Sequence, residues 1–255
     1  MAVLDTFSLK GEVALVTGSG RGIGRALALA LGEAGASVVL NDRGSGNAAE
    51  YADVLVKAGF SATCVEADVT DEMAVDSMIE RVYEQFGRLD VVVNNAGISI
   101  GAAALDTSPE LFQQVLDTNL GGVWNCSTSA ARRMRTHGGG RIVNIGSMSA
   151  LIVNRPRWQA PYLASKAAVH QLTKALAAEW APDNIRVNAL APGYILTEAS
   201  PVDQPQYREW CVEPAAMKRW GTPDELGPAV VFLASKASSF MTGSVVLIDG
   251  GYTLF

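Results

Sequence analysis

Near its amino terminus the chain reads Val13-Ala-Leu-Val-Thr-Gly-Ser-Gly-Arg-Gly-Ile-Gly24, in which four apolar residues run almost directly into four alternating glycines. An apolar helical pattern over 26–31 follows at once. A tight strand-to-helix turn needs residues that tolerate positive φ, and a side chain at Gly18, Gly22 or Gly24 would keep a pyrophosphate away from the backbone N–H groups. The stretch therefore predicts a dinucleotide-binding loop, made of Gly18, Ser19, Gly20, Arg21, Gly22, Ile23 and Gly24.

Six more short apolar runs follow, each separated from the next by a longer helical pattern. They are 37–40, 62–65, 89–93, 141–145, 186–190 and 244–248. Continuous apolar strands are covered on both faces, and right-handed helical crossovers supply that cover. We predict a single α/β domain over 1–255, a doubly wound (Rossmann) seven-stranded parallel sheet with helices on both faces. The irregular stretch 198–222, called the lid segment below, is the expected substrate lid.

Composition excludes several classes of function. A net charge of −6 without any block of Lys or Arg offers no field to gather the phosphates of a nucleic acid. No segment approaches the ~18 apolar residues that span a bilayer, and the first ten residues lack a signal-peptide pattern, so we expect no membrane contact and a cytoplasmic location. Three scattered cysteines and two histidines argue against a metal site or disulfides.

Further motifs follow the glycine loop in order along the chain. They are Asn94-Asn-Ala-Gly97, Asn119, Ser147, Tyr162-Leu-Ala-Ser-Lys166 and Pro192-Gly193. Together with the glycine loop they resemble the short-chain dehydrogenase/reductase family over nearly the whole chain, and most closely its polyol dehydrogenases of the galactitol dehydrogenase type. The resemblance implies an NAD(P)-dependent oxidoreductase that moves a hydride between a nicotinamide and an alcohol or carbonyl carbon. It implies four catalytic residues, Asn119, Ser147, Tyr162 and Lys166.

The chemistry of Tyr162 and Lys166 can be argued from their spacing. They stand four positions apart, so on a helix the ammonium lies beside the phenol. Lowering a phenol pKa from ~10 by about three units needs roughly 4 kcal/mol of phenolate stabilisation, which we expect Lys166 and an oxidised nicotinamide to supply. Tyr162 then exchanges a proton with the substrate oxygen. The resemblance adds that Lys166 reaches the nicotinamide ribose and that Asn119 binds a water linking Lys166 to solvent.

Two serines compete for the substrate oxygen. Ser147 lies fifteen residues before Tyr162, whereas the family's usual thirteen would select Ser149. We favour Ser147 because Asn144-Ile-Gly-Ser147 ends a predicted strand, where a hydroxyl is held rigidly and can stabilise charge on that oxygen. Ser149 remains the second candidate.

The family resemblance also implies where the rest of the cofactor lies. One group of residues flanks the adenosine and a second group flanks the nicotinamide. They are Asp68, Val69, Asn95, Ala96 and Gly97 on the adenosine side, and Pro192, Gly193, Ile195 and Thr197 on the nicotinamide side.

The end of the second strand predicts NAD in preference to NADP. Asp42 lies twenty-four residues beyond Gly18, where its carboxylate would accept hydrogen bonds from the ribose hydroxyls and repel a 2′-phosphate. Arg43 is also a candidate cofactor contact, because its guanidinium could pair with that phosphate. A solvated surface charge is the favoured interpretation of Arg43, so NAD is the expected cofactor.

The substrate is less well defined than the chemistry. Asn154 follows Ser147 on the loop that should wall the pocket, where its amide would bind a hydroxyl of a polyol; an Asx-turn residue that only orders the loop is nearly as good an interpretation. A 3-oxoacyl-thioester reductase would use the same catalytic residues. A dinucleotide-binding regulatory protein without turnover is the alternative from another class, although a sensor would be free to lose Tyr162.

We expect a homo-oligomer, and specifically a homotetramer. The predicted helices 109–134 and 162–180 carry apolar residues on more than one face. In the resembled family these helices pair across a two-fold interface, as closed symmetry requires.

Overall fold

Seven parallel strands lie side by side in the order β3-β2-β1-β4-β5-β6-β7 in the computed structural model, which describes residues 2–44 and 46–255. The chain order reverses between β1 and β4, so a crevice opens at the carboxyl ends of these two strands. The predicted doubly wound sheet is therefore confirmed. The strands are β1 (Val13–Val16), β2 (Ser37–Leu40), β3 (Ala62–Cys64), β4 (Val91–Asn94), β5 (Gly140–Ile145), β6 (Ile185–Pro192) and β7 (Val245–Ile248).

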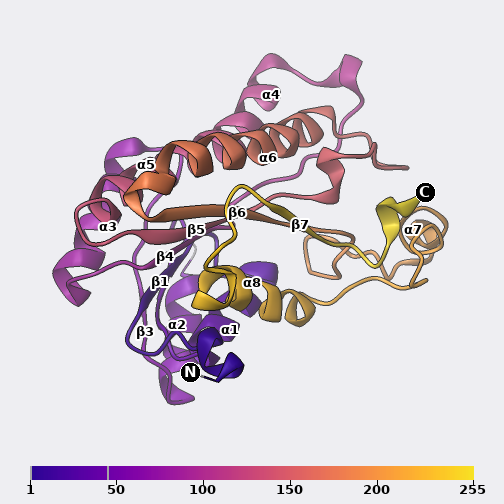
Figure 1. The fold of residues 1–255 in the computed structure, drawn as a ribbon. Helices are drawn as coiled ribbons and strands as arrows, with labels where there is room; N and C mark the ends of the chain where they lie inside the picture. The colour runs from indigo at the N-terminus through magenta and orange to yellow at the C-terminus, as the bar shows by residue number, and fades with distance from the viewer. Residues whose placement is uncertain (1, 45) are drawn as a thin grey trace.

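Helices cover both faces of the sheet, as Figure 1 shows. On one face lie α1 (Gly22–Glu33), α2 (Asn47–Lys57) and α8 (Gly227–Ala234). On the other lie α3 (Glu72–Phe86), α4 (Pro109–Leu116), α5 (Gly122–Met134) and α6 (Ala160–Trp180). Two hydrophobic clusters follow, one on each side of the sheet. This double cover explains why every residue of β1 and of β4 is buried.

One predicted helix is interrupted. We expected a continuous helix over 109–134, but a π-helical turn, Asp117–Gly121, separates α4 from α5. Such a turn inserts one residue into the helical repeat and often marks a functional site. Here it contains Asn119, which is fully buried.

The lid segment contains little regular structure. Its only named elements in the described chain are α7 (Pro205–Tyr207) and a π-helical turn, Arg208–Val212. It has a small apolar cluster of its own, in which Val202, Cys211 and Val212 are buried against Trp210, Trp220 and neighbouring residues. Trp158, by contrast, is 56% exposed. Two of the three tryptophans near the site therefore pack within the lid segment.

Across 2–44 and 46–255, no helix has the length and apolar character needed to cross a bilayer. These residues also bring together no cluster of His, Cys, Asp and Glu suited to a metal ion. Cys64, Cys126 and Cys211 are free thiols, and the last two are buried.

Candidate active site

A cavity of about 560 Å³ opens at the carboxyl ends of the strands. Its walls come from the loops that follow β1, β2, β3, β4, β5 and β6, and from the lid segment. All the predicted site residues line it except Ser19 and Asn119. The fold thus gathers into one cavity residues that lie as far apart in the sequence as Gly18 and Thr197.

The glycine loop has the shape of a phosphate cradle. Gly18 has a φ of +61°, and a Cβ there would stand 2.8 Å from the Cα of Ala96. A Cβ on Gly24 would stand 2.4 Å from the carbonyl oxygen of Gly18. Helix α1 begins in this loop, and no side chain caps its N-terminus. The free N–H groups and the helix dipole are therefore available to an anionic group in the cavity.

Ser19 does not contribute its side chain to the cavity. It is fully buried, and its Oγ accepts a hydrogen bond of 3.0 Å from the N–H of Asn41 at the end of β2. The Ser19 side chain therefore joins the glycine loop to β2 and does not face the cavity. Contact between Ser19 and the cofactor stays a prediction for its backbone.

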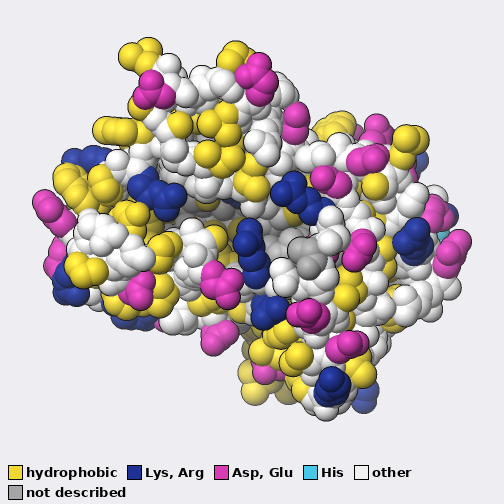
Figure 2. Space-filling model, turned by 180° about the vertical axis from the view of Figure 1, so that it is seen from behind, with side chains coloured by type: hydrophobic (Ala, Val, Ile, Leu, Met, Phe, Trp, Pro, Cys, Tyr) yellow, Lys and Arg dark blue, Asp and Glu magenta, His cyan; other side chains and the backbone are white. Residues whose placement is uncertain are grey.

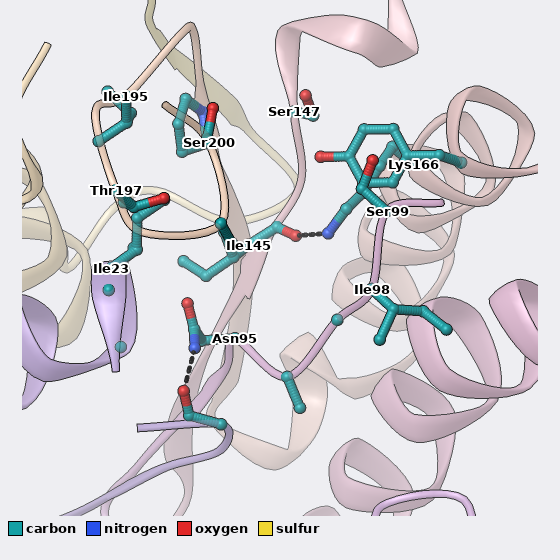
Figure 3. A pocket seen from close by; sticks show the side chains of 18 of the residues that line it. Ile23, Asn95, Ile98, Ser99, Ile145, Ser147, Lys166, Ile195, Thr197 and Ser200 are labelled. Carbon is teal, nitrogen blue, oxygen red and sulfur yellow. Dashed lines mark hydrogen bonds between the residues drawn. The ribbon is translucent and has the colours of Figure 1, made fainter. Parts of the chain in front are cut away.

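Asn95 braces the same loop from the end of β4. Its Nδ2 donates to the carbonyl oxygens of Thr17 and Gly18, both at 2.9 Å (Figure 3). Gly97 then passes close to two further site residues, because a Cβ there would lie 3.3 Å from Asn119 Oδ1 and 3.8 Å from Lys166 Nζ. Ala96 and Gly97 line the cavity as predicted.

At the far end of the cavity the Asp42 carboxylate lies over the glycine loop. Its two oxygens accept hydrogen bonds from the N–H groups of Gly44 and Ala48, at 3.1 and 3.0 Å. A Cβ on Gly20 would lie 3.0 Å from Asp42 Oδ2, so this glycine allows the close approach. Val69 lines the same end of the cavity.

Asp68 also lines this end of the cavity. The backbone N–H of Thr70 lowers the pKa of Asp68 by a hydrogen bond, and the nearby charge of Arg43 adds to this effect. Arg43 lines the cavity too, and its guanidinium is close enough to Asp68 for its charge to affect that carboxyl.

Ser147 is held between a loop and a helix. Its Oγ accepts the N–H of Ser149 at 3.0 Å, and its own N–H points to Nε2 of His170 at 3.4 Å. Nε2 is therefore the acceptor, which requires a neutral imidazole with the proton on Nδ1. Burial, with the charges of Lys166 and Lys174, lowers the pKa of His170 to about 4. His170 is thus a positioning residue for Ser147, a role that no sequence motif indicates.

Tyr162 and Lys166 lie one turn apart on α6 and face the end of β5. Lys166 Nζ lies 5.7 Å from the centre of the Tyr162 ring and donates to the carbonyl oxygen of Ile145 at 2.7 Å (Figure 3). Burial lowers the pKa of Lys166 to about 8.

The pKa of Tyr162 differs from the sequence-based expectation. Burial raises it, while a hydrogen bond with Ser147 acts in the opposite direction. The chain alone therefore does not produce the predicted lowering, because desolvation disfavours the phenolate more than its neighbours stabilise it.

Asn119 lies between the loop after β4 and α6. Its Oδ1 accepts the N–H of Ile98 at 2.8 Å, and its Nδ2 donates to the carbonyl of Ile98 and to Ser165 Oγ, at 2.9 and 3.0 Å. The side chain thus joins the loop after β4 to α6. The water that Asn119 is expected to bind stays a prediction, and the second lone pair of Oδ1 could accept from it.

The loop after β6 closes the side of the cavity where the nicotinamide is expected. Gly193 packs against Asp249, since a Cβ there would lie 2.6 Å from that residue's Cα. The methyl of Thr197 lies 3.6 Å from where a Cβ on Gly22 would stand, so the start of the lid segment rests on the glycine loop. Pro192 and Ile195 line the cavity beside them.

Polar groups line the substrate end. Asn154 is buried, and its Nδ2 donates to the Tyr194 hydroxyl at 2.9 Å. Asn154 Oδ1 is buried without a hydrogen-bond partner in the described chain, so Asn154 forms no Asx turn. Ser99 Oγ donates to Gln159 Oε1 at 2.7 Å nearby. Sequence analysis did not identify several other residues that line the cavity, because no motif marks them and only the folded chain brings them together. They are Ser99, Gln159, Arg155, Arg157, Tyr207 and Cys211.

A phosphate cradle that leads to a buried tyrosine, serine and lysine defines a dinucleotide-dependent oxidoreductase. Comparison with known proteins agrees with this class. A family model described as enoyl-(acyl carrier protein) reductase matches residues 18–253. Galactitol 2-dehydrogenase (L-tagatose-forming) of Cereibacter sphaeroides is 43% identical over 251 residues, which cover 98% of each chain.

Solved structures of similar chains have the same fold. A short-chain type dehydrogenase/reductase of Mycobacterium marinum superposes with a TM-score of 0.95 at 43% identity, over 99% of both chains. A gluconate 5-dehydrogenase of Burkholderia cenocepacia, solved in complex with NADP and tartrate, superposes with a TM-score of 0.95 at 41% identity over 100% of both. The chain belongs to the short-chain dehydrogenase/reductase family. It is an NAD(P)-dependent alcohol dehydrogenase or carbonyl reductase.

Proposed function

We propose that the protein interconverts a secondary alcohol and a ketone in a polyhydroxylated substrate, a polyol or sugar alcohol. The observation that carries the proposal is the Ser147–Tyr162 pair above Lys166, which opens into a pocket walled by the buried amide of Asn154. Similarity to galactitol 2-dehydrogenase supports the same substrate class.

The proposed proton donor and acceptor is the Tyr162 hydroxyl. Because burial raises its pKa, the phenol is protonated at neutral pH, which is the state that gives a proton to a carbonyl oxygen. In the opposite direction the phenolate must form, and the Ser147 hydrogen bond and the Lys166 charge both favour it. Ser147 also donates to the substrate oxygen and stabilises charge developing there.

The cradle around Gly18, Gly22 and the α1 N-terminus would hold the pyrophosphate of the dinucleotide, and Lys166 would reach its nicotinamide ribose. When bound, the dinucleotide supplies or accepts the hydride. The chain's own part is to orient the substrate between Tyr162, Ser147 and the lid segment and to exclude water from that end.

NAD is the cofactor we propose. Asp42 lines the cavity over Gly20, where its negative charge would lie beside the adenosine ribose and oppose a 2′-phosphate. Arg43 lines the same end, and its charge acts on Asp68 there, so it is the residue that could offset this repulsion.

A panel of alcohols and ketones tests the reaction class. Reduced-nicotinamide absorbance is followed with galactitol, glucitol, mannitol and xylitol, and with a 3-oxoacyl thioester in the reducing direction. Turnover of at least one polyol is expected to exceed that of the thioester in kcat/KM by at least tenfold. A preference for the thioester would instead identify the 3-oxoacyl-thioester reductase, the alternative considered in the sequence analysis. Turnover of neither, with dinucleotide binding intact, would identify a regulatory protein.

We also propose a homotetramer in the cytoplasm. Free thiols at Cys64, Cys126 and Cys211 suit a reducing compartment. Helices α4 and α5 expose Phe112 and Trp124, 41% and 50% accessible, on the face that the family uses for pairing.

A further inference from the structure

Two arginines stand at the substrate end of the cavity. Arg155 and Arg157 lie on the loop that connects Ser147 with α6, and both line the cavity together with Asn154 and Cys211. This is the opposite end from Asp42, so the two guanidinium groups are placed for the substrate and not for the adenosine.

Contacts with neighbouring groups hold each guanidinium in place, while its N–H groups donate no hydrogen bond within the described chain. Arg155 lies over the ring of Trp210 in the lid segment, 4.9 Å from the ring centre. Arg157 lies against the loop after β4, where Nε and Nη2 would stand 3.8 and 3.9 Å from a Cβ on Gly101. An arginine that stacks on an aromatic ring keeps its in-plane N–H groups available for an anion.

No carboxylate of the described chain neutralises this pair. The ion pairs formed by residues 2–44 and 46–255 include neither Arg155 nor Arg157, and their side chains donate no hydrogen bond there. The arginines of the lid segment, by contrast, are paired, Arg208 with Glu213 and Arg219 with Glu225. In a protein with a net charge of −6, acidic partners are plentiful, so two unpaired cations in one pocket form a distinct positive site.

Basic side chains are also found on the molecular surface around the hollow. In Figure 2 the face that contains the hollow has Lys and Arg side chains around its rim. Because the walls of a cleft focus the field of such charges, an anionic ligand is drawn into the hollow more strongly than a neutral one.

We propose that the physiological substrate is a polyhydroxylated chain with an anionic group at the end remote from the reacting carbon, which Arg155 and Arg157 bind. The anion is a carboxylate, as in an aldonate, or a phosphate, as in a polyol phosphate; both match the planar N–H fork of arginine. This inference rests on the proposed function. It assigns a binding site to the far end of the substrate, whose secondary alcohol would react at Tyr162 and Ser147.

Substrates that differ only in their terminal group show how much the anion contributes to kcat/KM. Glucitol, gluconate and glucitol 6-phosphate share one hydroxylated chain, as do galactitol, galactonate and galactitol 1-phosphate. We expect kcat/KM for at least one anionic member to exceed that of its neutral counterpart by tenfold or more. Its KM should rise with salt while that of the neutral member stays constant. The better anion, carboxylate or phosphate, identifies the source.

Variants test the two arginines directly. Arg155→Gln and Arg157→Gln should each lower kcat/KM for the anionic member by about ten- to a hundredfold and leave the neutral member within about threefold. Arg155→Lys, which keeps the charge without the planar fork, should restore part of the preference. Arg208→Gln is the matched control, because Arg208 lies in the lid segment, whose neighbouring residues Tyr207 and Cys211 line the cavity, but does not line the cavity itself; it should leave kcat/KM for both substrates unchanged.

The outcomes distinguish this inference from the proposed function. Polyol turnover with no preference for an anion, or an equal loss for neutral and anionic members in the Gln variants, would overturn the anion site and leave the polyol reaction standing. Equal losses would show that the arginines only hold the lid segment. Calorimetric titration of the NADH complex, which cannot oxidise an alcohol, with gluconate and glucitol 6-phosphate needs no turnover, so it decides the anion site even if the thioester proves to be the substrate. Absence of binding, or binding unchanged in both variants, would refute it.

Discussion

The hydroxyl of Ser147 has neighbours that the hydroxyl of Ser149 lacks. Ser147 Oγ accepts the Ser149 N–H and acts on Tyr162 by lowering its pKa, and the Ser147 backbone is tied to His170. Ser149 lines the cavity, but its contribution to this network is its backbone N–H. The geometry therefore supports Ser147 as the residue that binds the substrate oxygen.

The serine comparison follows from this arrangement. Ser147→Ala should lower kcat by about a hundredfold because it removes the hydroxyl that stabilises charge on the substrate oxygen. Ser149→Ala keeps the backbone N–H and should cost less than about fivefold. Steady-state kinetics on the two variants decide between them, and a larger loss in Ser149→Ala would reverse the assignment.

Replacing Tyr162 separates proton transfer from cofactor binding. Tyr162→Phe deletes only the hydroxyl, so turnover should fall by at least about a hundredfold while the dissociation constant for the dinucleotide changes less than threefold. Lys166→Ala should impair both, since Lys166 is expected at the ribose. Fluorescence titration and initial rates measure the two quantities. A Phe variant with more than about a tenth of the activity would show that another group transfers the proton.

Asp42 controls cofactor choice in our proposal. Repulsion of about 2–3 kcal/mol between its carboxylate and a 2′-phosphate corresponds to a preference for NAD of roughly thirty- to over a hundredfold. Asp42→Ala should narrow that gap mainly by improving kcat/KM for NADP, and Arg43→Gln, as the neighbouring control, should not improve it. Equal kcat/KM for both cofactors in the unmodified protein would contradict the proposal.

At the scale of elements, α6 and the end of β5 act as one unit. Three side chains of α6, those of Tyr162, Lys166 and His170, reach the segment 145–147. Gly146 makes this possible, because a Cβ there would lie 2.3 Å from His170 Nε2. The sheet thus sets the position of Ser147, and the helix sets its orientation relative to Tyr162.

This coupling predicts an acid-sensitive stability. Unfolded His170 takes up a proton near its usual pKa of 6.5, whereas folding lowers the pKa to about 4. Acid therefore favours the unfolded chain, and stability that is present above pH 6.5 is lost as the pH falls toward 4. Urea unfolding across this range should show a loss on the order of 1–2 kcal/mol from this group after solvent screening.

The matched control is the other histidine. His170→Gln should flatten the stability profile between pH 6.5 and 4, while the same change at exposed His137 should leave the profile as it was. A wild-type profile already flat over this interval would contradict the assignment of a neutral buried imidazole.

At the scale of the whole molecule, two groups among the exposed apolar side chains concern the assembly. One is on α4 and α5 at Phe112 and Trp124; the other is at the sheet edge and carboxyl terminus, where Leu247 of β7 is 40% and Phe255 97% exposed. Two separate self-complementary surfaces are what a tetramer with two kinds of two-fold interface requires. Figure 1 shows β7 and the carboxyl terminus away from α5.

Light scattering tests the assembly. The protein should have about four times the 26.8 kDa chain mass, and Trp124→Glu should yield dimers by placing a charge in one of the two interfaces. Val54→Glu is the control, because Val54 is 54% exposed on α2, outside both surfaces. A monomer at working concentration would remove the proposal.

Much of this architecture could be predicted from the sequence because its signals are local. A buried parallel strand appears as a short β-branched run, and a phosphate loop needs glycines where a Cβ would collide, as at Gly18 and Gly24. The spacing of Tyr162 and Lys166 likewise places both on one helix face, whatever the rest of the chain contributes. The strand and helix signals depend on neighbours within a few residues, whereas the space at Gly18 is also limited by the distant residue Ala96.

Other features depend on contacts between segments distant in sequence, and only the tertiary structure decided them. Burial raises the pKa of Tyr162, and the Asn119 amide forms hydrogen bonds with Ile98 and Ser165. The spacing of residues in the sequence reveals neither of these two features. Arg155 and Arg157 carry no motif, and they became a candidate anion site only when folding placed them beside Trp210 and Gly101 without a carboxylate. Solvation, pairing of charges and pocket shape are properties of the packed chain, which is why the sequence could suggest candidate residues for the reaction but could not give their environments.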